Sequence, residues 1–369
     1  MTRNGLALPE RPGDLTPEWL TGALRHSGAL TSGRITGASF EPLGVGAGFI
    51  GQIGRLTLTY DDAAADGPVT VIAKMPSLEE GARAIASLYG LYERELRFYR
   101  ELADRIAIRT PRLYYGDGDP DRVAYILLFE DLSATGTVGD QVKGCSGEQA
   151  RLALEQLARH HAMWWGAEQL RPLAWLQPGV DLVEAAMKQS YPASWPKALE
   201  AFGQRMSPAV RDALPELGRR VMERIAPYRD GPLTLVHGDY RLDNMFFGGP
   251  DADYDLAVVD WQSPNLSWGA YDIAYFMYGN IDIDTRRAHE HEVLRRYHEI
   301  LLEHGVRDYS WERLLDDYVA SLVVSLAIWV VNAATLDTAN ERGMALFELF
   351  FDRLGAAIAD HNALARLPA

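Results

Sequence analysis

The sequence has almost no cysteine and no export signal. Cys145 is the single cysteine among 369 residues, so the chain cannot form an internal disulfide. The opening segment, residues 1–5, lacks the long apolar core of a secretory signal peptide. We therefore expect a cytoplasmic protein.

Positive charge is also scarce. The 36 Lys and Arg residues stand against 51 Asp and Glu residues, which gives a formal net charge of −15. Proteins that bind a phosphate backbone cluster Lys and Arg, and no segment of this chain is strongly basic. We expect no nucleic-acid partner, because a neutral or cationic small molecule fits this charge better.

Only one run of residues is long and apolar enough to suggest a membrane span. Residues 318–336 approach the required length and carry almost no charge. Ser321, Ser325 and Asn332 interrupt the run, and no second span, positively charged flank or aromatic belt accompanies it. We predict a buried helix there and no membrane partner.

Alternating β-rich and helical stretches divide the chain into two unlike parts. Residues 35–74 are β-rich, residues 79–104 have helical spacing, and residues 125–129 form a continuous apolar run typical of a strand. Beyond residue 140 the pattern is helical, with one β interruption between 233 and 259. The expected helical segments are 147–170, 179–203, 208–227, 285–304 and 310–360. We predict an α+β fold in which a small antiparallel sheet precedes a mainly helical part.

The β interruption contains the most polar motif of the chain. Segment 237–244 follows a short apolar strand directly and ends where another strand begins, as a catalytic loop does. The next two strands are joined by a turn-rich segment, so they can form an antiparallel hairpin. Pairing Phe247 with Leu256 would bring Asn244 close to Asp260.

Asn244 and Asp260 supply an amide oxygen and a carboxylate, which are hard ligands suited to Mg²⁺. This ion keeps several waters and takes further ligands from phosphates, so a cage made only of protein is not required. Asp239 lies five residues before Asn244 on the same loop. There it could orient an incoming hydroxyl and accept its proton during phosphoryl transfer.

The pattern H-G-D-x-x-x-x-N, followed by a hairpin and V-D-W, resembles the aminoglycoside phosphotransferase and choline kinase-like group. This resemblance implies a protein-kinase-like two-lobe fold, with ATP and Mg²⁺ as cofactors. It implies that Asp239 is the catalytic aspartate, that Asn244 and Asp260 are metal ligands, and that His237 stabilises the loop. Trp261 departs from protein kinases, in which Asp-Phe-Gly occupies the equivalent position.

The resemblance also assigns residues to the nucleotide. Lys74 ends a strand like the family strand whose lysine meets the α- and β-phosphates. Its expected partner is Glu95 on the following helix. Glu93 is the alternative, but its side chain points about 200° away around the helix, so only one of the two can face Lys74.

A glycine-rich segment precedes this strand, in the order expected of a loop that covers ATP. Gly46 and Gly48 would allow close approach of the backbone to phosphates. The chain contains no G-x-x-x-x-G-K-[ST] motif, so a P-loop fold is not supported.

Four further positions have roles that the motifs suggest. Arg241 occupies the position at which protein kinases have a lysine, and it either contacts the γ-phosphate or pairs with Asp243 or another acid. Glu130 and Leu132 lie in the expected hinge, where backbone groups could bind adenine, although an ordinary loop would have the same sequence. Asp272 resembles the family aspartate that ties a helix to the catalytic loop.

These motifs predict an N-lobe over 1–131, a hinge near 129–135 and a helical C-lobe over 136–369. The resemblance extends from about residue 35 to 340 and is nearest to the ecdysteroid-kinase-like branch and to bacterial phosphotransferases without an assigned substrate. We expect an ATP-dependent kinase that phosphorylates a hydroxyl group of a small molecule, such as a metabolite, natural product or antibiotic. The alternatives are a non-catalytic nucleotide-binding module and a protein kinase. The motifs identify neither the acceptor nor the oligomeric state, and they do not distinguish ATP from GTP.

Overall fold

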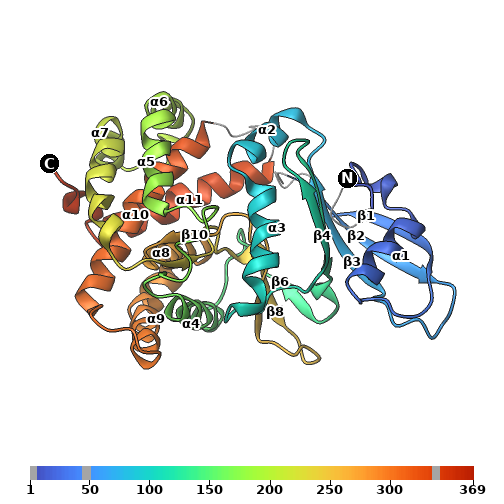
Figure 1. Ribbon diagram of the computed structural model, residues 1–369. Helices are drawn as coiled ribbons and strands as arrows, with labels where there is room; N and C mark the ends of the chain where they lie inside the picture. The colour runs from blue at the N-terminus through green and yellow to red at the C-terminus, as the bar shows by residue number, and fades with distance from the viewer. Residues whose placement is uncertain (1–5, 44–50, 335–340) are drawn as a thin grey trace.

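The structure is a computed structural model that describes residues 6–43, 51–334 and 341–369. A five-stranded antiparallel sheet lies at one end of the molecule, and most of the helices lie at the other (Figure 1). The strand order is β1-β2-β3-β5-β4. The strands are β1 (Ile35–Pro42), β2 (Gly51–Tyr60), β3 (Thr70–Pro76), β4 (Leu113–Asp119) and β5 (Ala124–Glu130).

Helices cover both faces of this sheet. Along β5, Ile126 and Leu128 pack into the core shared with α1 (Pro17–His26). The alternate residues Leu127 and Phe129 belong to the core that includes α3 (Leu91–Glu101). Successive strand residues point to opposite faces, so a strand covered on both sides has to be apolar throughout. The continuous apolar run of β5 is therefore explained.

The helical segment predicted over 79–104 is two helices. Helix α2 (Glu80–Leu88) ends before α3 begins, and Gly90 between them has a φ of 62°. Glycine adopts this left-handed conformation without steric cost, whereas a straight helix cannot contain it. The break frees α3 to lie between the sheet and the helical part (Figure 1).

The C-terminal part is mainly helical, as expected. Predicted segment 179–203 splits at Ser190, and segment 310–360 contains two helices. The α-helices are α4 (Gly147–Met163), α5 (Gly179–Gln189), α6 (Tyr191–Phe202), α7 (Pro208–Ile225), α8 (Ala270–Asn280), α9 (Ile283–Glu303), α10 (Trp311–Ala333) and α11 (Glu341–Asp360). Short 3-10 helices are η1 (Pro12–Asp14), η2 (Ala103–Arg105), η3 (Leu132–Ala134), η4 (Ala226–Asp230), η5 (Leu242–Asn244) and η6 (Ala363–Arg366).

Helix α10 contains the long apolar run of the sequence. By length and composition it could cross a membrane, but 72% of its most apolar window is buried inside the protein. Its neighbours include α6, α8 and α11. The run is therefore accounted for as a helix at the centre of the helical part, where apolar residues are required on all sides.

Two small sheets form the β interruption. Strands β6 (Gly136–Val138), β8 (Met245–Gly248) and β9 (Leu256–Val258) make one sheet, and β7 (Thr234–Val236) pairs with β10 (Asn265–Ser267) in the other. The predicted hairpin is confirmed, because β8 and β9 are antiparallel and Phe247 pairs with Leu256. The division proposed at 129–135 includes the last two residues of β5 and ends directly before β6 begins.

Candidate active site

The loop after β7 presents Asp239 at the edge of the helical part. Gly238 has a φ of 81°, and a Cβ placed on it would lie 2.4 Å from the carbonyl oxygen of Ser263. Only glycine satisfies both constraints. The backbone N–H groups of His237 and Gly238 donate to the buried Asp272 carboxylate of α8, at 2.7 and 3.0 Å. Asp272 therefore fixes the direction in which the loop leaves its strand.

His237 fastens the same loop to the neighbouring hairpin. Its Nε2 lies 3.0 Å from the carbonyl oxygen of Val259, and its Nδ1 accepts from the backbone N–H of Asp239 at 3.2 Å. The ring packs against Trp261, with centroids 4.5 Å apart. Trp261 also stacks on Phe98 of α3 at 4.3 Å. The tryptophan that departs from the protein-kinase motif thus joins the loop to α3.

Three side chains hold the Asp239 carboxylate. The Tyr275 hydroxyl donates to Oδ1 at 2.8 Å, while Arg241 Nε and Asn244 Nδ2 each donate to Oδ2 at 3.0 Å. Burial alone would raise the pKa of Asp239. The charge of Arg241, together with the hydrogen bonds that Tyr275 and Arg241 donate, outweighs burial and holds this pKa below its ordinary value. The carboxylate is therefore ionised at neutral pH and its position is fixed.

Tyr275 was not among the residues singled out from the sequence. It lies on α8, three residues after Asp272. Residues three apart on a helix share a face, so both side chains reach the loop. This spacing from Asp272 was the available signal, because a residue one turn along the same helix face must also lie near the loop.

Arg241 pairs with acids on both sides. Besides Asp239, it contacts Asp243, with Nη1 2.9 Å from Oδ2. Of the two alternatives that the sequence left open, the pairing with Asp243 is present. The contact between Arg241 and a phosphate stays a prediction.

Asn244 and Asp260 are brought together by the hairpin. The backbone N–H of Val259, next to Asp260, donates to the carbonyl oxygen of Asn244 at 2.9 Å. Asp260 has a φ of 64°, which costs a non-glycine residue about 1 kcal/mol or more. This strain is maintained by the hairpin and turns the carboxylate away from ordinary strand geometry.

The two side chains fit the chemistry of Mg²⁺. Asn244 uses its Nδ2 to donate to Asp239, which leaves its amide oxygen as the metal-binding atom. Asp260 uses Oδ1 for Lys74, and its second oxygen is a hard anionic donor. Within the described ranges, no three His, Cys, Asp or Glu residues cluster as a metal site. An Mg²⁺ ion held by Asn244 and Asp260 would take further ligands from phosphates and water, because this ion usually binds through one or two carboxylates and keeps several waters.

Lys74 connects this hairpin to the sheet and to α3. Its Nζ lies 2.7 Å from Glu95 Oε2 and 2.5 Å from Asp260 Oδ1. The choice of Glu95 as the partner is confirmed, since Glu93 pairs instead with Arg97 at 3.8 Å and its side chain is 46% exposed. Burial disfavours the ammonium, but the two carboxylates outweigh it, and the pKa of Lys74 is raised.

The surroundings of Glu95 disfavour the ionised form of its side chain. Its side chain is 2% exposed and shares one ammonium with Asp260. Burial raises the pKa of Glu95, and the charge of Asp260 raises it further, while Lys74 lowers it. The resulting pKa of Glu95 is about 7. The cost of ionising a buried carboxyl next to another acidic side chain therefore falls on Glu95.

With this geometry established, the chain can be compared with known proteins. The model of the ecdysteroid kinase-like family matches residues 45–310, which is more than half of the chain. The chain belongs to the ecdysteroid kinase-like family. The matched span includes the catalytic loop, Lys74 and the hairpin of this family member, whereas α11 lies beyond it.

Solved structures show that this ecdysteroid kinase-like chain has the kinase-like fold. A choline kinase from Cryptosporidium parvum Iowa II superposes with a TM-score of 0.54 at 9% identity, covering 89% of this chain and 91% of that one. The GDP complex of wild-type aminoglycoside 2'-phosphotransferase-IIIa has a TM-score of 0.51 at 17% identity, with 85% and 92% covered. The fold is therefore that of small-molecule phosphotransferases, as the motifs predicted.

A curated relative of this family member is longer and shares only a segment with it. Acyl-CoA dehydrogenase family member 11 from Homo sapiens is 31% identical over 84 residues, which are 23% of this chain. The chain spans only 10% of the length of that protein.

The predicted adenine-binding positions are engaged within the protein. The Glu130 side chain accepts from Arg109 Nη2 at 2.8 Å, and its backbone N–H donates to the carbonyl oxygen of Arg112 at 2.9 Å. Leu132 is buried, and its carbonyl oxygen accepts from the backbone N–H of Thr135 at 3.2 Å. Adenine binding at these residues stays a prediction, and Gly46 and Gly48 lie outside the described residues.

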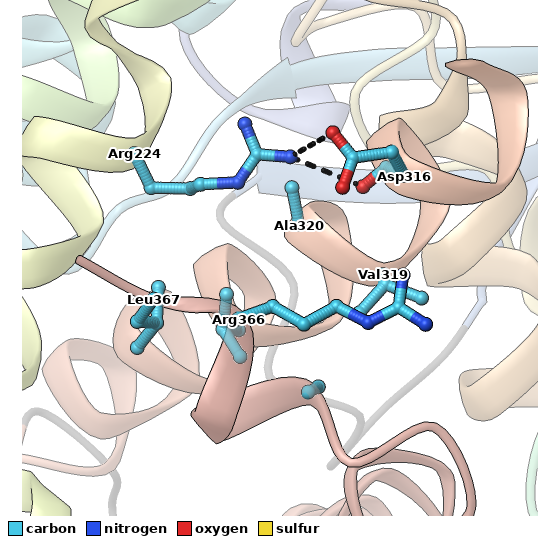
Figure 2. A pocket seen from close by; sticks show the side chains of 8 residues that line it. Arg224, Asp316, Val319, Ala320, Arg366 and Leu367 are labelled. Atoms are coloured by element: carbon cyan, nitrogen blue, oxygen red, sulfur yellow. Dashed lines mark hydrogen bonds and ion pairs between the residues drawn. The ribbon is translucent and has the colours of Figure 1, made fainter. Parts of the chain in front are cut away.

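One pocket of this family member lies elsewhere, between α7, α10 and the C-terminal residues (Figure 2). Arg224 and Arg366 are among its lining residues, and Arg224 donates to Asp316 at 2.5 Å across it (Figure 2). None of the predicted site residues that the structure describes lines this pocket.

Proposed function

We propose that this chain transfers the γ-phosphate of Mg·ATP to a hydroxyl group of a small molecule. The observation that carries the proposal is Lys74, whose ammonium contacts both Glu95 and Asp260. One residue thereby joins the sheet and α3, which would hold the nucleotide, to the hairpin beside Asp239. Membership in a family of small-molecule phosphotransferases supports the same reaction class.

Each residue has a separate task in this reaction. Lys74 binds the α- and β-phosphates and is oriented by Glu95. Asn244 and Asp260 hold Mg²⁺, which when bound neutralises charge on the phosphates. Asp239 orients the acceptor hydroxyl and accepts its proton as the oxygen attacks the γ-phosphorus. The bond from the γ-phosphorus to the β,γ-bridging oxygen then breaks, and ADP leaves.

Arg241 would contact the transferred phosphate. In the free protein its guanidinium is held by two carboxylates, of Asp239 and Asp243. A bound γ-phosphate would offer a third anionic partner in the same place. Gly46 and Gly48 would cover the phosphates from the side of the sheet, and the backbone near Glu130 and Leu132 would bind adenine.

The acceptor that we propose is a ring-bearing or hydrophobic alcohol. The ring of Tyr275, whose hydroxyl binds Asp239, lies nearly parallel to that of Trp329, at 10° and 6.3 Å. Trp329 in turn stacks on Phe350 at 3.9 Å. An aromatic group beside the catalytic carboxylate favours apolar ring faces over a polycationic sugar. Trp164 and Trp268, in contrast, are buried in the core.

The test is ADP formation by the full chain with Mg·ATP and a panel of acceptors. The panel contains a kanamycin-type aminoglycoside, choline, simple sugars, sterol-like and polyketide alcohols, and a protein substrate. With an apolar alcohol as acceptor, we expect the wild-type chain to form ADP and a phosphorylated product, identified by mass spectrometry. The variant Asp239→Asn should form neither. Nucleotide binding without turnover of any acceptor would favour a non-catalytic module. Phosphorylation of protein alone would favour a protein kinase, and exclusive use of the aminoglycoside would overturn the acceptor class only.

A further inference from the structure

Helix α11 contributes two arginines to the region around the catalytic loop. Arg342 and Arg353 are eleven residues apart, which is about three helical turns, so they lie on the same face of the helix. Arg353 is buried and donates to the carbonyl oxygens of Gln141 and Gly279, at 3.3 and 3.1 Å. It therefore anchors this face of α11 against α8 and the segment after β6.

Arg342 reaches the catalytic loop itself. Its Nη2 lies 3.1 Å from both carboxylate oxygens of Asp243. Asp243 also accepts from Arg241 Nη1 at 2.9 Å and from the backbone N–H of Gln141 at 2.9 Å. Arg241 in turn donates to Asp239 at 3.0 Å. A continuous chain of charged contacts thus runs from α11 to the catalytic aspartate.

The charges along this chain give Arg342 a specific role. Among the described residues, Arg241 would without Arg342 be the one arginine or lysine paired with the carboxylates of Asp239 and Asp243. It would then be bound more tightly to Asp243 and less available to a phosphate or to Asp239. With Arg342 present, Asp243 has a second cationic partner, so it competes less strongly with Asp239 for the guanidinium of Arg241.

We propose that Arg342 is a positioning residue for phosphoryl transfer, which acts through Asp243 to keep Arg241 beside Asp239. The proposal rests on the proposed function and extends it to a helix outside the matched family span of 45–310. Arg342 itself touches neither Asp239 nor the reacting atoms. Its side chain is 39% exposed, and partly exposed ion pairs contribute little to stability. The effect of removing it therefore falls on turnover rather than on folding.

Inorganic phosphate released from Mg·ATP, with water as the acceptor, provides a readout that requires no identified substrate. Water attacks the γ-phosphorus, Asp239 accepts the proton, and ADP and phosphate leave. We expect Arg342→Ala to lower kcat about tenfold, the size of coupling common in one ion-pair network, with KM for ATP within about twofold. Arg342→Lys should recover part of the loss, because it restores the positive charge without the planar fork.

Asp243→Asn and the double variant test the route of the effect. If Arg342 acts through Asp243, adding Arg342→Ala to Asp243→Asn changes kcat by less than about twofold. The matched control is Arg205→Ala, which removes ion pairs to Glu348 and Asp352 of the same helix, away from the loop. It should leave kcat unchanged, and both single arginine variants should shift Tm by about 2 °C or less.

The outcomes separate this inference from the proposed function. Additive losses in the double variant, or equal losses in Arg342→Ala and Arg205→Ala, overturn the positioning role and leave the kinase proposal intact. A wild-type chain that releases no phosphate from Mg·ATP, and phosphorylates no acceptor in the panel, overturns both.

Discussion

The Tyr275 hydroxyl donates a hydrogen bond to Oδ1 of Asp239 at 2.8 Å, from a different element of the fold. A hydrogen bond donated to the ionised form of a carboxyl lowers its pKa. Tyr275→Phe should therefore raise the pKa of Asp239 and free its side chain to rotate. We expect kcat to fall about tenfold, within the range of a lost acid–base contribution, and the acid limb of the pH–rate profile to move to higher pH.

Tyr278→Phe is the matched control for this change. Tyr278 is on the same helix and is buried, but its hydroxyl accepts from Trp329 Nε1 at 2.9 Å. It should leave the acid limb in place. Equal shifts of the limb in both variants would show that the packing of α8, rather than the hydrogen bond, controls Asp239.

The pairs that local geometry determines could be predicted from the sequence. A two-stranded hairpin carries Asn244 to the neighbourhood of Asp260, and the 100° step of a helix means that only one of Glu93 and Glu95 can face Lys74. The choice of Glu95 came from the family resemblance, whereas the geometry of both cases needs only the spacing of residues within a hairpin or a helix. The same is true of the fold class, which follows from the change from strand to helix spacing near residue 140.

Contacts between elements distant in the chain could not be predicted in this way. Arg342 reaches the loop because α11 packs beside it, and its own segment carries no motif that indicates a partner. For Tyr275 the one signal was indirect, namely its spacing of three residues from Asp272 on α8. Arg241 remained ambiguous because an arginine near two acids fits either role. The break at Gly90 was visible as a glycine, but helical spacing continues on both sides of it and suggested one helix.

Lys74→Ala should lower stability as well as turnover. The sequence alone suggests an effect on chemistry, but the ammonium separates two carboxylates, Glu95 and Asp260, at a buried position. Removing one partner of a buried ion pair leaves charge uncompensated, at a cost of about 3 kcal/mol or more. We expect a Tm lower by several degrees, measured by calorimetry, together with loss of ATP turnover.

The double variant Lys74→Ala/Glu95→Gln separates the two effects. It removes one of the carboxylates left behind, so Tm should recover most of its loss while turnover does not. Recovery of turnover in parallel with Tm would contradict the role of Lys74 toward the phosphates.

Glu95 should make the stability of the protein depend on pH near neutrality. Its pKa is about 7 in the folded chain, against an ordinary value of 4.5. The folded chain therefore holds a proton that the unfolded chain has already released, and the associated stability is lost as pH rises through 7. Glu95→Gln removes this loss. We expect the Tm difference, variant minus wild type, to increase between pH 5.5 and 8.5.

The exposed neighbour Glu93 provides the control for this titration. Glu93→Gln removes the same charge from the same helix, at a side chain that is 46% exposed. Its Tm difference from wild type should stay constant over the same pH range. A constant difference for Glu95→Gln would mean that Lys74 compensates Glu95 fully.

Asp260 and Asp239 should differ in what each contributes to nucleotide binding. Asp260→Ala removes the charged oxygen proposed to hold Mg²⁺, whereas Asp239→Asn removes the proton acceptor and keeps the proposed metal ligands. Calorimetric titration with ATP, with Mg²⁺ and with EDTA, distinguishes the two. In wild type and Asp239→Asn, EDTA should weaken ATP binding by about tenfold or more, which corresponds to about 1.4 kcal/mol. In Asp260→Ala, binding should be equally weak under both conditions. Turnover should be lost in both variants. If the affinity of Asp260→Ala for ATP still depends on Mg²⁺, other residues hold the metal. Full turnover by Asp239→Asn would show that Asp239 is not the proton acceptor.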